Sequence, residues 1–205
     1  MNFHFIMAVW GNSYTDLFLN VVLPTQLSEG NLLAFRHMGQ SKYEIYTTSN
    51  DAEIIRKSPT FHALSKIIAT EICLIDDVNL LDKYKAMTEC HRRAILASQE
   101  DNAILVFLAP DNIWSDGSFK RLLQIAAIGK RLVLTRNIIV ARETFVPDFT
   151  KRFFSQNHYS VSIAPRELVK VALHHLHPFT LSLFNDSKKF REWPNRFTMK
   201  KNPKE

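Results

Sequence analysis

Short apolar runs recur along the chain, and polar or turn-forming residues separate them. Runs of this length, rich in aliphatic and aromatic residues, are typical of strands that are buried on both faces of a parallel sheet. The predicted strands are Phe3–Val9, Tyr43–Thr47, Glu71–Ile75, Ile104–Ala109, Arg131–Thr135 and Ile138–Ala141.

Segments with apolar residues at intervals of three and four lie between these runs and predict amphipathic helices. Pro24 is expected to bend or end the first helix, and Asn50 or Asp51 to cap the second. Because strands and helices alternate, the sequence predicts an α/β protein with a mainly parallel open sheet flanked by helices. The predicted helices are Tyr14–Gln26, a helix through Ile54 and Ile55, Thr60–Ile68, Leu80–Ser98, Asp116–Ile128 and Arg166–His175.

Length and composition are those of an ordinary globular protein. The chain has 205 residues, of which 46% are hydrophobic and 22% charged, so we expect one α/β domain over residues 1–187. No apolar run approaches the roughly 20 residues that span a bilayer, and no secretory leader is evident. The chain has two cysteines, which fit reduced thiols, so a cytoplasmic location is expected.

The positive charge is concentrated at the C-terminus. The formal net charge is +6, and residues 188–205 hold seven basic and two acidic residues. The domain itself is therefore nearly neutral, and we expect no nucleic-acid partner. Phe190, Trp193 and Phe197 alternate with these charges, which favours either peripheral contact with a membrane surface or acidic partner, or a packed C-terminal arm.

The most informative stretch is the predicted strand Ile104–Ala109, which ends at Pro110-Asp111. In open α/β sheets, ligands bind at the carboxyl ends of the strands, where Asp111 would lie. A carboxylate there either holds a divalent cation that binds phosphate, or starts a turn. Asp116 either has the same function or caps the following helix, and the cap is the favoured interpretation. The glycine-rich motifs of dinucleotide folds and P-loops are absent from the sequence.

This stretch resembles the central segment of nucleotide-sugar glycosyltransferases of the GT-A fold, in which a buried strand reaches a DxD-type motif. The matching residues are Ala109-Pro110-Asp111, so the final acid of the motif is present and the first is replaced by alanine. The preceding helix, with Lys83-Tyr84, Met87, His91-Arg92 and Ile95, is also similar, and the resemblance spans roughly Phe3–Phe145.

The resemblance implies transfer of a sugar from a nucleotide-sugar donor to an unknown acceptor, with Mn²⁺ or Mg²⁺ as cofactor. It implies a nucleotide site at the ends of the first strands and metal contact through Asp111. The expected nucleotide-binding residues are Trp10, Gly11, Thr48, Lys83 and Trp114. Trp114 alternatively only packs in the core.

Glu143 and Asp148 are candidate catalytic bases in an inverting member of the family. Arg142, beside Glu143, is a candidate to bind a phosphate. The alternative for Arg142 and Glu143 is a solvated strand end. His177 is a candidate metal ligand, and His174 lies three residues before it. The alternative is that these imidazoles only interact with a helix C-terminus.

Two other functions stay open at this point. One is a non-catalytic or truncated GT-A-like binding protein, favoured by Ala109 and by the short chain. The other is a binding module that uses the basic, aromatic tail on a membrane or an acidic partner.

Overall fold

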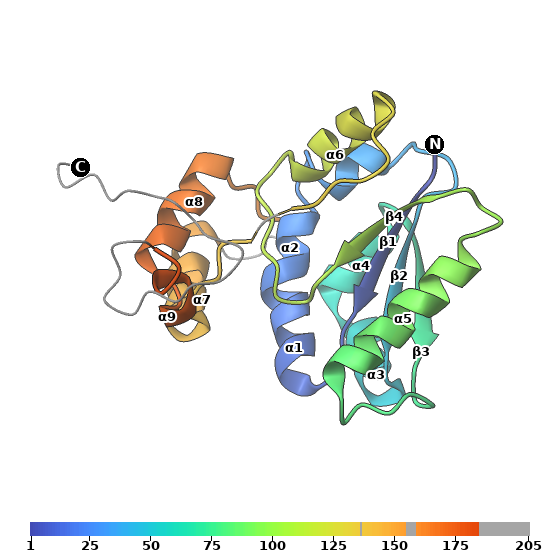
Figure 1. Cartoon of the computed structure of the whole chain (residues 1–205), viewed down its shortest axis with the longest axis horizontal. Coiled ribbons are helices and arrows are strands. Elements are labelled where there is room, and N and C mark those ends of the chain that lie inside the picture. Colours follow the sequence, from blue (N-terminus) through green and yellow to red (C-terminus); the bar gives the residue numbers. More distant parts are fainter. Residues whose placement is uncertain (136, 155–158, 185–205) are drawn as a thin grey trace. The chain divides into compact units, whose positions relative to one another are not determined.

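The computed structural model describes residues 1–135, 137–154 and 159–184, and these form two compact units (Figure 1). The first unit is Met1–Arg131 together with the described part of Ser155–Ile163. The second unit is Leu132–Phe154 together with the described residues from Ala164 onwards. The first unit contains the sheet, and the second is helical.

The sheet has four strands, all parallel, in the order β3-β2-β1-β4. Every residue of β1 is buried, as expected for a central strand covered on both faces. The prediction of an α/β protein with a parallel open sheet is thus confirmed. The strands are β1 Phe3–Ala8, β2 Lys42–Thr47, β3 Ala69–Leu74 and β4 Ile104–Leu108.

Helices follow the strands in the first unit and make up most of the second. Those of the first unit are α1 Asn12–Leu17, η1 Phe18–Val22, α2 Leu23–Gln26, η2 Leu32–Phe35, α3 Ser49–Lys57, α4 Pro59–Ser65, α5 Lys83–Ala97 and α6 Ser118–Ala127. Those of the second are α7 Arg142–Phe153, α8 Pro165–His174 and α9 Pro178–Leu181.

The first predicted helix is a succession of α1, η1 and α2. The middle segment, η1, is a π-helix that ends two residues before Pro24. Proline lacks an amide hydrogen and clashes with the carbonyl four residues earlier in a regular α-helix. The wider π turn accommodates Pro24 in the first turn of α2, so the proline does not end the helix.

One face of the sheet, which we call the α1 face, is built from aromatic rings. Phe5 is fully buried and lies 5.1 Å from Phe35, 5.3 Å from Phe119 and 6.2 Å from Tyr43, measured between ring centroids. Tyr43 donates a hydrogen bond of 2.7 Å to Gln26 of α2. These contacts hold the first helices and α6 against this face.

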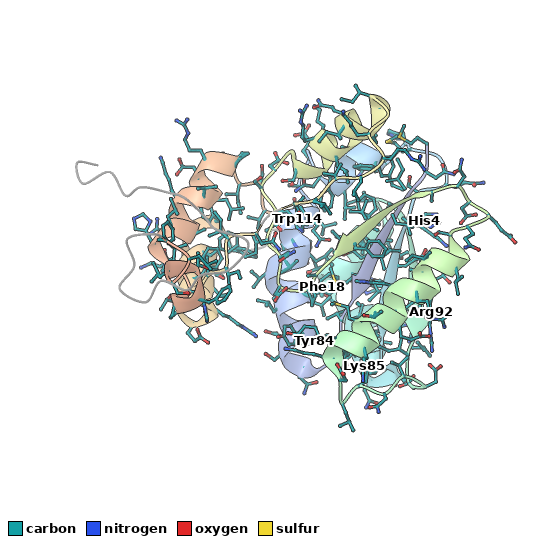
Figure 2. All side chains as sticks on the ribbon, viewed as in Figure 1. His4, Phe18, Tyr84, Lys85, Arg92 and Trp114 are labelled. Carbon is teal, nitrogen blue, oxygen red and sulfur yellow. The ribbon has the colours of Figure 1, made fainter. Side chains whose placement is uncertain are left out.

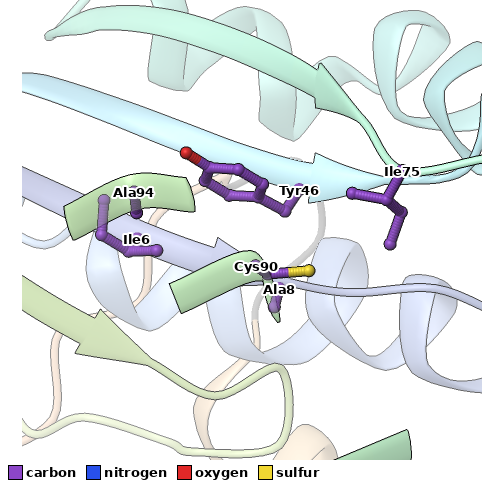
Figure 3. Packing of buried hydrophobic residues seen from close by; sticks show 6 residues of the cluster. All are labelled: Ile6, Ala8, Tyr46, Ile75, Cys90 and Ala94. Carbon is purple, nitrogen blue, oxygen red and sulfur yellow. The ribbon is translucent and has the colours of Figure 1, made fainter. Parts of the chain in front are cut away.

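The opposite face, which we call the α5 face, is covered by α5 (Figure 3). Cys90 and Ala94 of α5 pack against alternate residues of the strands, whose side chains point to this side. The buried cluster consists of Ile6, Ala8, Tyr46, Ile75, Cys90 and Ala94. Both cysteines are free thiols, in agreement with the sequence interpretation.

Two predicted strands are wrong. Arg131–Thr135 forms no strand, and Ile138–Ala141 contributes a single antiparallel bridge, Val140 to Leu176. The handedness of crossover connections explains the first case. Phe119 places α6 on the α1 face, whereas a right-handed crossover from β4 to a parallel strand outside it would need a helix on the α5 face.

Helix α7 was not predicted, because Pro147 lies inside it and Glu143 was placed just after a strand. In the structure Glu143 lies in the first turn of α7. Phe145 and Phe149 of this helix are buried and stack with their ring centroids 5.2 Å apart. The packing of this aromatic pair offsets the hydrogen bond that Pro147 removes.

A polar network lies at the amino end of the α5 face, around the buried carboxylate of Glu44. Lys42 Nζ lies 3.1 Å and His4 Nδ1 3.4 Å from Glu44 Oε1, and Tyr46 donates a 2.9 Å hydrogen bond to Oε2. His4 Nε2 lies 3.5 Å from Asp101. Burial, followed by the nearby Lys42 charge, lowers the pKa of His4 below its usual range.

This network predicts a loss of stability in mildly acidic solution. Because the pKa of His4 is lower in the folded chain, the unfolded state binds more protons as the pH falls below about 6.5. The free energy of unfolding should therefore decrease from that pH down to the folded pKa. Burial lowers the pKa of His91 as well, so it adds to the same trend.

The test compares urea unfolding of the wild type and His4→Gln between about pH 7.5 and 5. The variant should lose less free energy of unfolding across this range than the wild type. A His62→Gln variant, which changes an exposed histidine, is the control and should follow the wild type. Equal losses in wild type and His4→Gln would show that His4 is not buried in its neutral form.

Candidate functional site

The order of the strands reverses between β1 and β4. The chain runs from β1 to β2 and β3 on one side and then returns to the other side of β1 as β4. At such a switch point, the loops after the two strands separate and leave a crevice at the carboxyl edge. Here these loops are Val9-Trp10-Gly11 and Ala109-Pro110-Asp111.

The loop after β1 holds two of the predicted nucleotide-binding residues. Trp10 is half-buried and packs on the buried cluster of the α5 face, whereas Gly11 is exposed. Gly11 has a φ of 83°, a left-handed conformation that favours glycine, and it precedes the first turn of α1.

Asp51, in the first turn of α3, joins the loops after β1 and β2. Its carboxylate accepts hydrogen bonds from the Gly11 amide at 2.9 Å, from the Thr15 hydroxyl at 2.8 Å and from the Thr48 hydroxyl at 2.7 Å. The side chain is buried. The Gly11 amide at the start of α1, where a dinucleotide fold binds phosphate, is therefore occupied by a carboxylate of the protein itself.

The cap of α3 differs from the prediction. Thr48 is the N-cap residue, and its hydroxyl accepts a hydrogen bond from the Asp51 amide, so neither Asn50 nor Asp51 caps the helix. Thr48, predicted to contact a nucleotide, lies at the carboxyl edge with its hydroxyl engaged by Asp51. This joint was not predicted from the sequence, because two of the three donors to Asp51, Gly11 and Thr15, are distant from it in the chain.

Two further carboxylates, those of Asp76 and Asp77, hold the loop after β3 in place next to the Asp51 hydrogen bonds. Asp76 accepts hydrogen bonds from the amide and the hydroxyl of Ser49, at 3.0 and 2.6 Å, which lower its pKa. Asp77 binds the Arg93 guanidinium through both oxygens, at 3.0 and 2.6 Å, and this pairing lowers its pKa. The loops after β2 and β3 are thus fixed by ionised side chains.

Asp111 lies in a turn directly after β4, in which the Asn112 amide donates to the Ala109 carbonyl at 3.2 Å. Its side chain is exposed and has no hydrogen-bond or ion-pair partner among the described residues. Asp111 therefore has a free carboxylate at the carboxyl edge of the sheet, as expected from its position after β4.

Trp114 lies deeper in the molecule than expected. Its ring packs edge-on against Phe119 at 5.1 Å, and its amide donates to the Thr25 hydroxyl at 3.2 Å. The segment after Asp111 therefore runs beside α2, away from the carboxyl edge, and Trp114 joins the core of the α1 face.

Asp116 does not cap α6, because the N-cap residue is Gly117. The Asp116 carboxylate instead accepts hydrogen bonds from the Gly30 amide at 2.7 Å and the Ser162 hydroxyl at 2.9 Å. It fixes segments of the first unit that are distant in the sequence, which is a structural role.

Lys83 is the first residue of α5, and Asp82 caps this helix by accepting from the amides of Tyr84 and Lys85. Its ammonium lies 5.1 Å from the centroid of the Tyr84 ring, and both side chains are exposed. Figure 2 labels Tyr84 and Lys85 in this first turn of α5. Lys83 thus offers a positive charge in the part of the first unit that follows β3.

The remaining predicted site residues belong to the second unit. Asp148 accepts from Arg152 Nε at 2.8 Å and lies 2.9 Å from His175 Nε2, and these partners, Arg152 first, lower its pKa. His177 Nδ1 accepts from the Phe179 amide at 3.1 Å and caps α9. His174 Nδ1 lies 2.7 Å from the Lys170 carbonyl near the end of α8, as the helix-terminus alternative expected.

A groove of about 350 Å³ lies at the opposite, amino edge of the sheet. Its lining includes Arg36, Met38, Lys42, Ile67 and Ile68. This groove was not predicted from the sequence, because its walls come from the loops before β2 and β3.

Three features limit what the described residues can bind or do. They contain no group of three or more His, Cys, Asp or Glu side chains that could hold a metal ion. None of the helices described is both long and apolar enough to cross a membrane. Residues 188–205, predicted as a basic aromatic tail, lie outside the described part of the chain.

Comparisons with known proteins add no further assignment. Neither the family models, nor the curated proteins, nor the solved structures include a match to this chain.

The hydrogen bonds of Asp51 predict that removing its carboxylate lowers the free energy of unfolding. In Asp51→Ala, the buried Thr15 hydroxyl and the partly buried Gly11 amide and Thr48 hydroxyl lose their acceptor. Buried donors without partners cost about 1–3 kcal/mol each, so the free energy of unfolding should fall by about 3 kcal/mol in total.

Urea unfolding followed by tryptophan fluorescence measures this change. Asp16→Ala removes an exposed carboxylate of α1 that binds Asn20 of η1, and it should change stability by no more than about 0.5 kcal/mol. If Asp51→Ala behaves like Asp16→Ala, the loops at the carboxyl edge do not depend on Asp51.

Proposed function

We propose that this protein has a GT-A-like fold, binds a nucleotide-sugar at the carboxyl edge of its sheet and transfers the sugar to an acceptor. The observation that carries this proposal is the switch point between β1 and β4, with Trp10-Gly11 on one side and the free carboxylate of Asp111 on the other. Ligands of open parallel sheets bind at this place.

Different residues around the switch point are proposed to contact different parts of the nucleotide-sugar. The half-buried ring of Trp10 offers an apolar surface for a base or ribose, and Gly11 leaves open space beside it. The Lys83 ammonium supplies a positive charge for a diphosphate. Because Asp51 occupies the Gly11 amide, the diphosphate is expected beside Asp111 and not on the start of α1.

Asp111 is the proposed contact to a divalent cation. A single carboxylate and the oxygens of a bound diphosphate are a common ligand set for Mg²⁺, and no three-residue metal group is present among the described side chains. A cation at Asp111 would therefore depend on the diphosphate for most of its ligands. Bound there, it would neutralise charge on the leaving nucleotide.

In the proposed transfer, the acceptor oxygen forms a bond to the anomeric carbon of the sugar while the bond to the diphosphate breaks. The acceptor proton passes to a base. The sequence-based candidates are Glu143 and Asp148, which belong to the second unit, whereas the proposed donor site belongs to the first. Asp148 is the weaker of the two as a base, because Arg152 and His175 hold its pKa below the usual range. Glu143 lies exposed in the first turn of α7.

A second candidate function is nucleotide-sugar binding without transfer. It is favoured by Ala109, which replaces the first acid of the motif, and by the engagement of Asp148 with Arg152 and His175. For either function, the free thiols of Cys73 and Cys90 support a cytoplasmic location as part of the proposal.

The test is a thermal-shift panel of UDP, GDP, CDP and their common sugars, with and without Mn²⁺. A ligand at about 100 times its dissociation constant adds roughly 2.7 kcal/mol, which raises the Tm by about 5–10 °C in a chain of this size. We expect one nucleotide family to raise the Tm, and Asp111→Asn to remove the part of the shift that needs Mn²⁺.

Glu29→Gln, which neutralises an exposed carboxylate outside the crevice loops, is the matched control and should keep the full shift. No shift with any nucleotide would contradict the proposed function. A shift that survives in Asp111→Asn would contradict only the role of Asp111. Release of free sugar or its transfer to an acceptor would then separate the two candidate functions.

A further inference from the structure

The two edge strands of the sheet differ sharply in polarity. On β3, Glu71 is exposed, and its carboxylate lies 3.6 Å from Lys42 Nζ. Charges of this kind protect an edge strand from pairing with another strand. On β4, residues Ile104–Leu108 are all apolar, and the Phe107 side chain is 44% exposed. No strand pairs with the outer edge of β4 in the described part of the chain.

Helix α5 shows the same asymmetry above the sheet. On its side toward β3, Arg93 binds Glu89 and Asp77. Arg92, labelled in Figure 2, also binds Glu89. On its side toward β4, the His91 ring lies 4.6 Å from Phe107. Ile95, one turn further, is 44% exposed. The outer edge of β4 with Phe107, His91 and Ile95 is called the β4-edge surface below.

An open apolar edge of this kind is unusual. An apolar edge strand of five residues is rarely left open to water, which indicates that something else covers this surface. The His91 Nε2 atom has no hydrogen-bond partner among the described residues, but it is itself buried and so lies beneath this surface.

The following segment of the same chain does not fit as a parallel neighbour of β4. It would have to cross over by way of α6, which lies on the α1 face, and this would be a left-handed connection. The segment 131–135 accordingly forms no strand, with Leu132 and Leu134 exposed.

We infer that the β4-edge surface pairs with the same surface of a second copy of this chain. Two β4 strands that run antiparallel across a twofold axis satisfy each other's free backbone groups. Because every side chain of β4 is apolar, each meets an apolar side chain of the partner in any register. His91 and Ile95 of both copies then flank the joined strands, and the two sheets form one continuous sheet of eight strands.

The experiment measures the mass of the full-length protein by light scattering and sedimentation velocity between about 1 and 100 µM, the range in which a micromolar dimer forms. We expect a dimer. Phe107→Glu and Ile95→Glu place a charge in the proposed interface and should each weaken dimerisation by about a hundredfold or more.

Each variant has a matched control that carries the same charge outside the interface. Leu74→Glu changes a 47% exposed residue on the other edge strand, and Leu96→Glu changes a 50% exposed residue beside Ile95, on the charged side of α5. Both controls should dimerise like the wild type. Circular dichroism checks that each variant folds. If Phe107→Glu does not fold, Ile95→Glu, which changes a residue on the helix surface, is used to test the interface.

A wild type that stays monomeric at the highest concentration overturns the inference. So does a dimer that Ile95→Glu leaves intact. A dimer that Leu74→Glu disrupts while Phe107→Glu does not would place the interface at β3 and also overturn it. Nucleotide binding is measured separately, so these outcomes are independent of the proposed function.

Discussion

Complete burial of β1 is the constraint on which the rest of the structure depends. All of its side chains are buried, so β1 needs a strand on each side and a helical layer on each face. The connections place β2 and β3 on one side and β4 on the other. The reversal of strand order between β1 and β4 follows from this arrangement, and open sheets bind their ligands at switch points of this kind.

The loops at that edge are held before any ligand is bound. Asp51 joins Gly11 to Thr48, and Asp76 joins Ser49 to the loop after β3. This preorganisation restricts the kind of site that the edge can form. Since the Gly11 amide is used internally, the proposed ligand would place its anionic part beside Lys83 or beside a cation at Asp111. The edge therefore favours a site that differs from the phosphate loop of dinucleotide folds.

Much of the sheet was predictable from the sequence, because strands buried on both faces leave a local signature of continuous apolar residues. β1 and β4 were found in this way to within one residue. Segment 131–135 has the same signature but forms no strand, because a parallel strand there would require a left-handed crossover through α6. Helix α7 was missed because Pro147 is a local signal against a helix, whereas its stability comes from packed aromatic rings.

The site was predictable only in part. Gly11 and Asp111 follow buried strands, and their place at the carboxyl edge could be inferred from that alone. The role of Asp51 could not, since two of its three hydrogen-bond donors lie 36 and 40 residues away in the chain. Trp114 was misplaced because its short distance from Asp111 in sequence does not show that the segment turns back along α2.

The most direct test of the central claim is an NMR titration of the ¹⁵N-labelled protein with the nucleoside diphosphate that stabilises it most. The account predicts that the amide signals of Trp10, Gly11 and Asp111 shift together and saturate at one ligand concentration, while those of Glu71 and Met38 do not move. Shifts confined to the groove around Met38, or no shifts at any residue, would contradict a nucleotide site between β1 and β4.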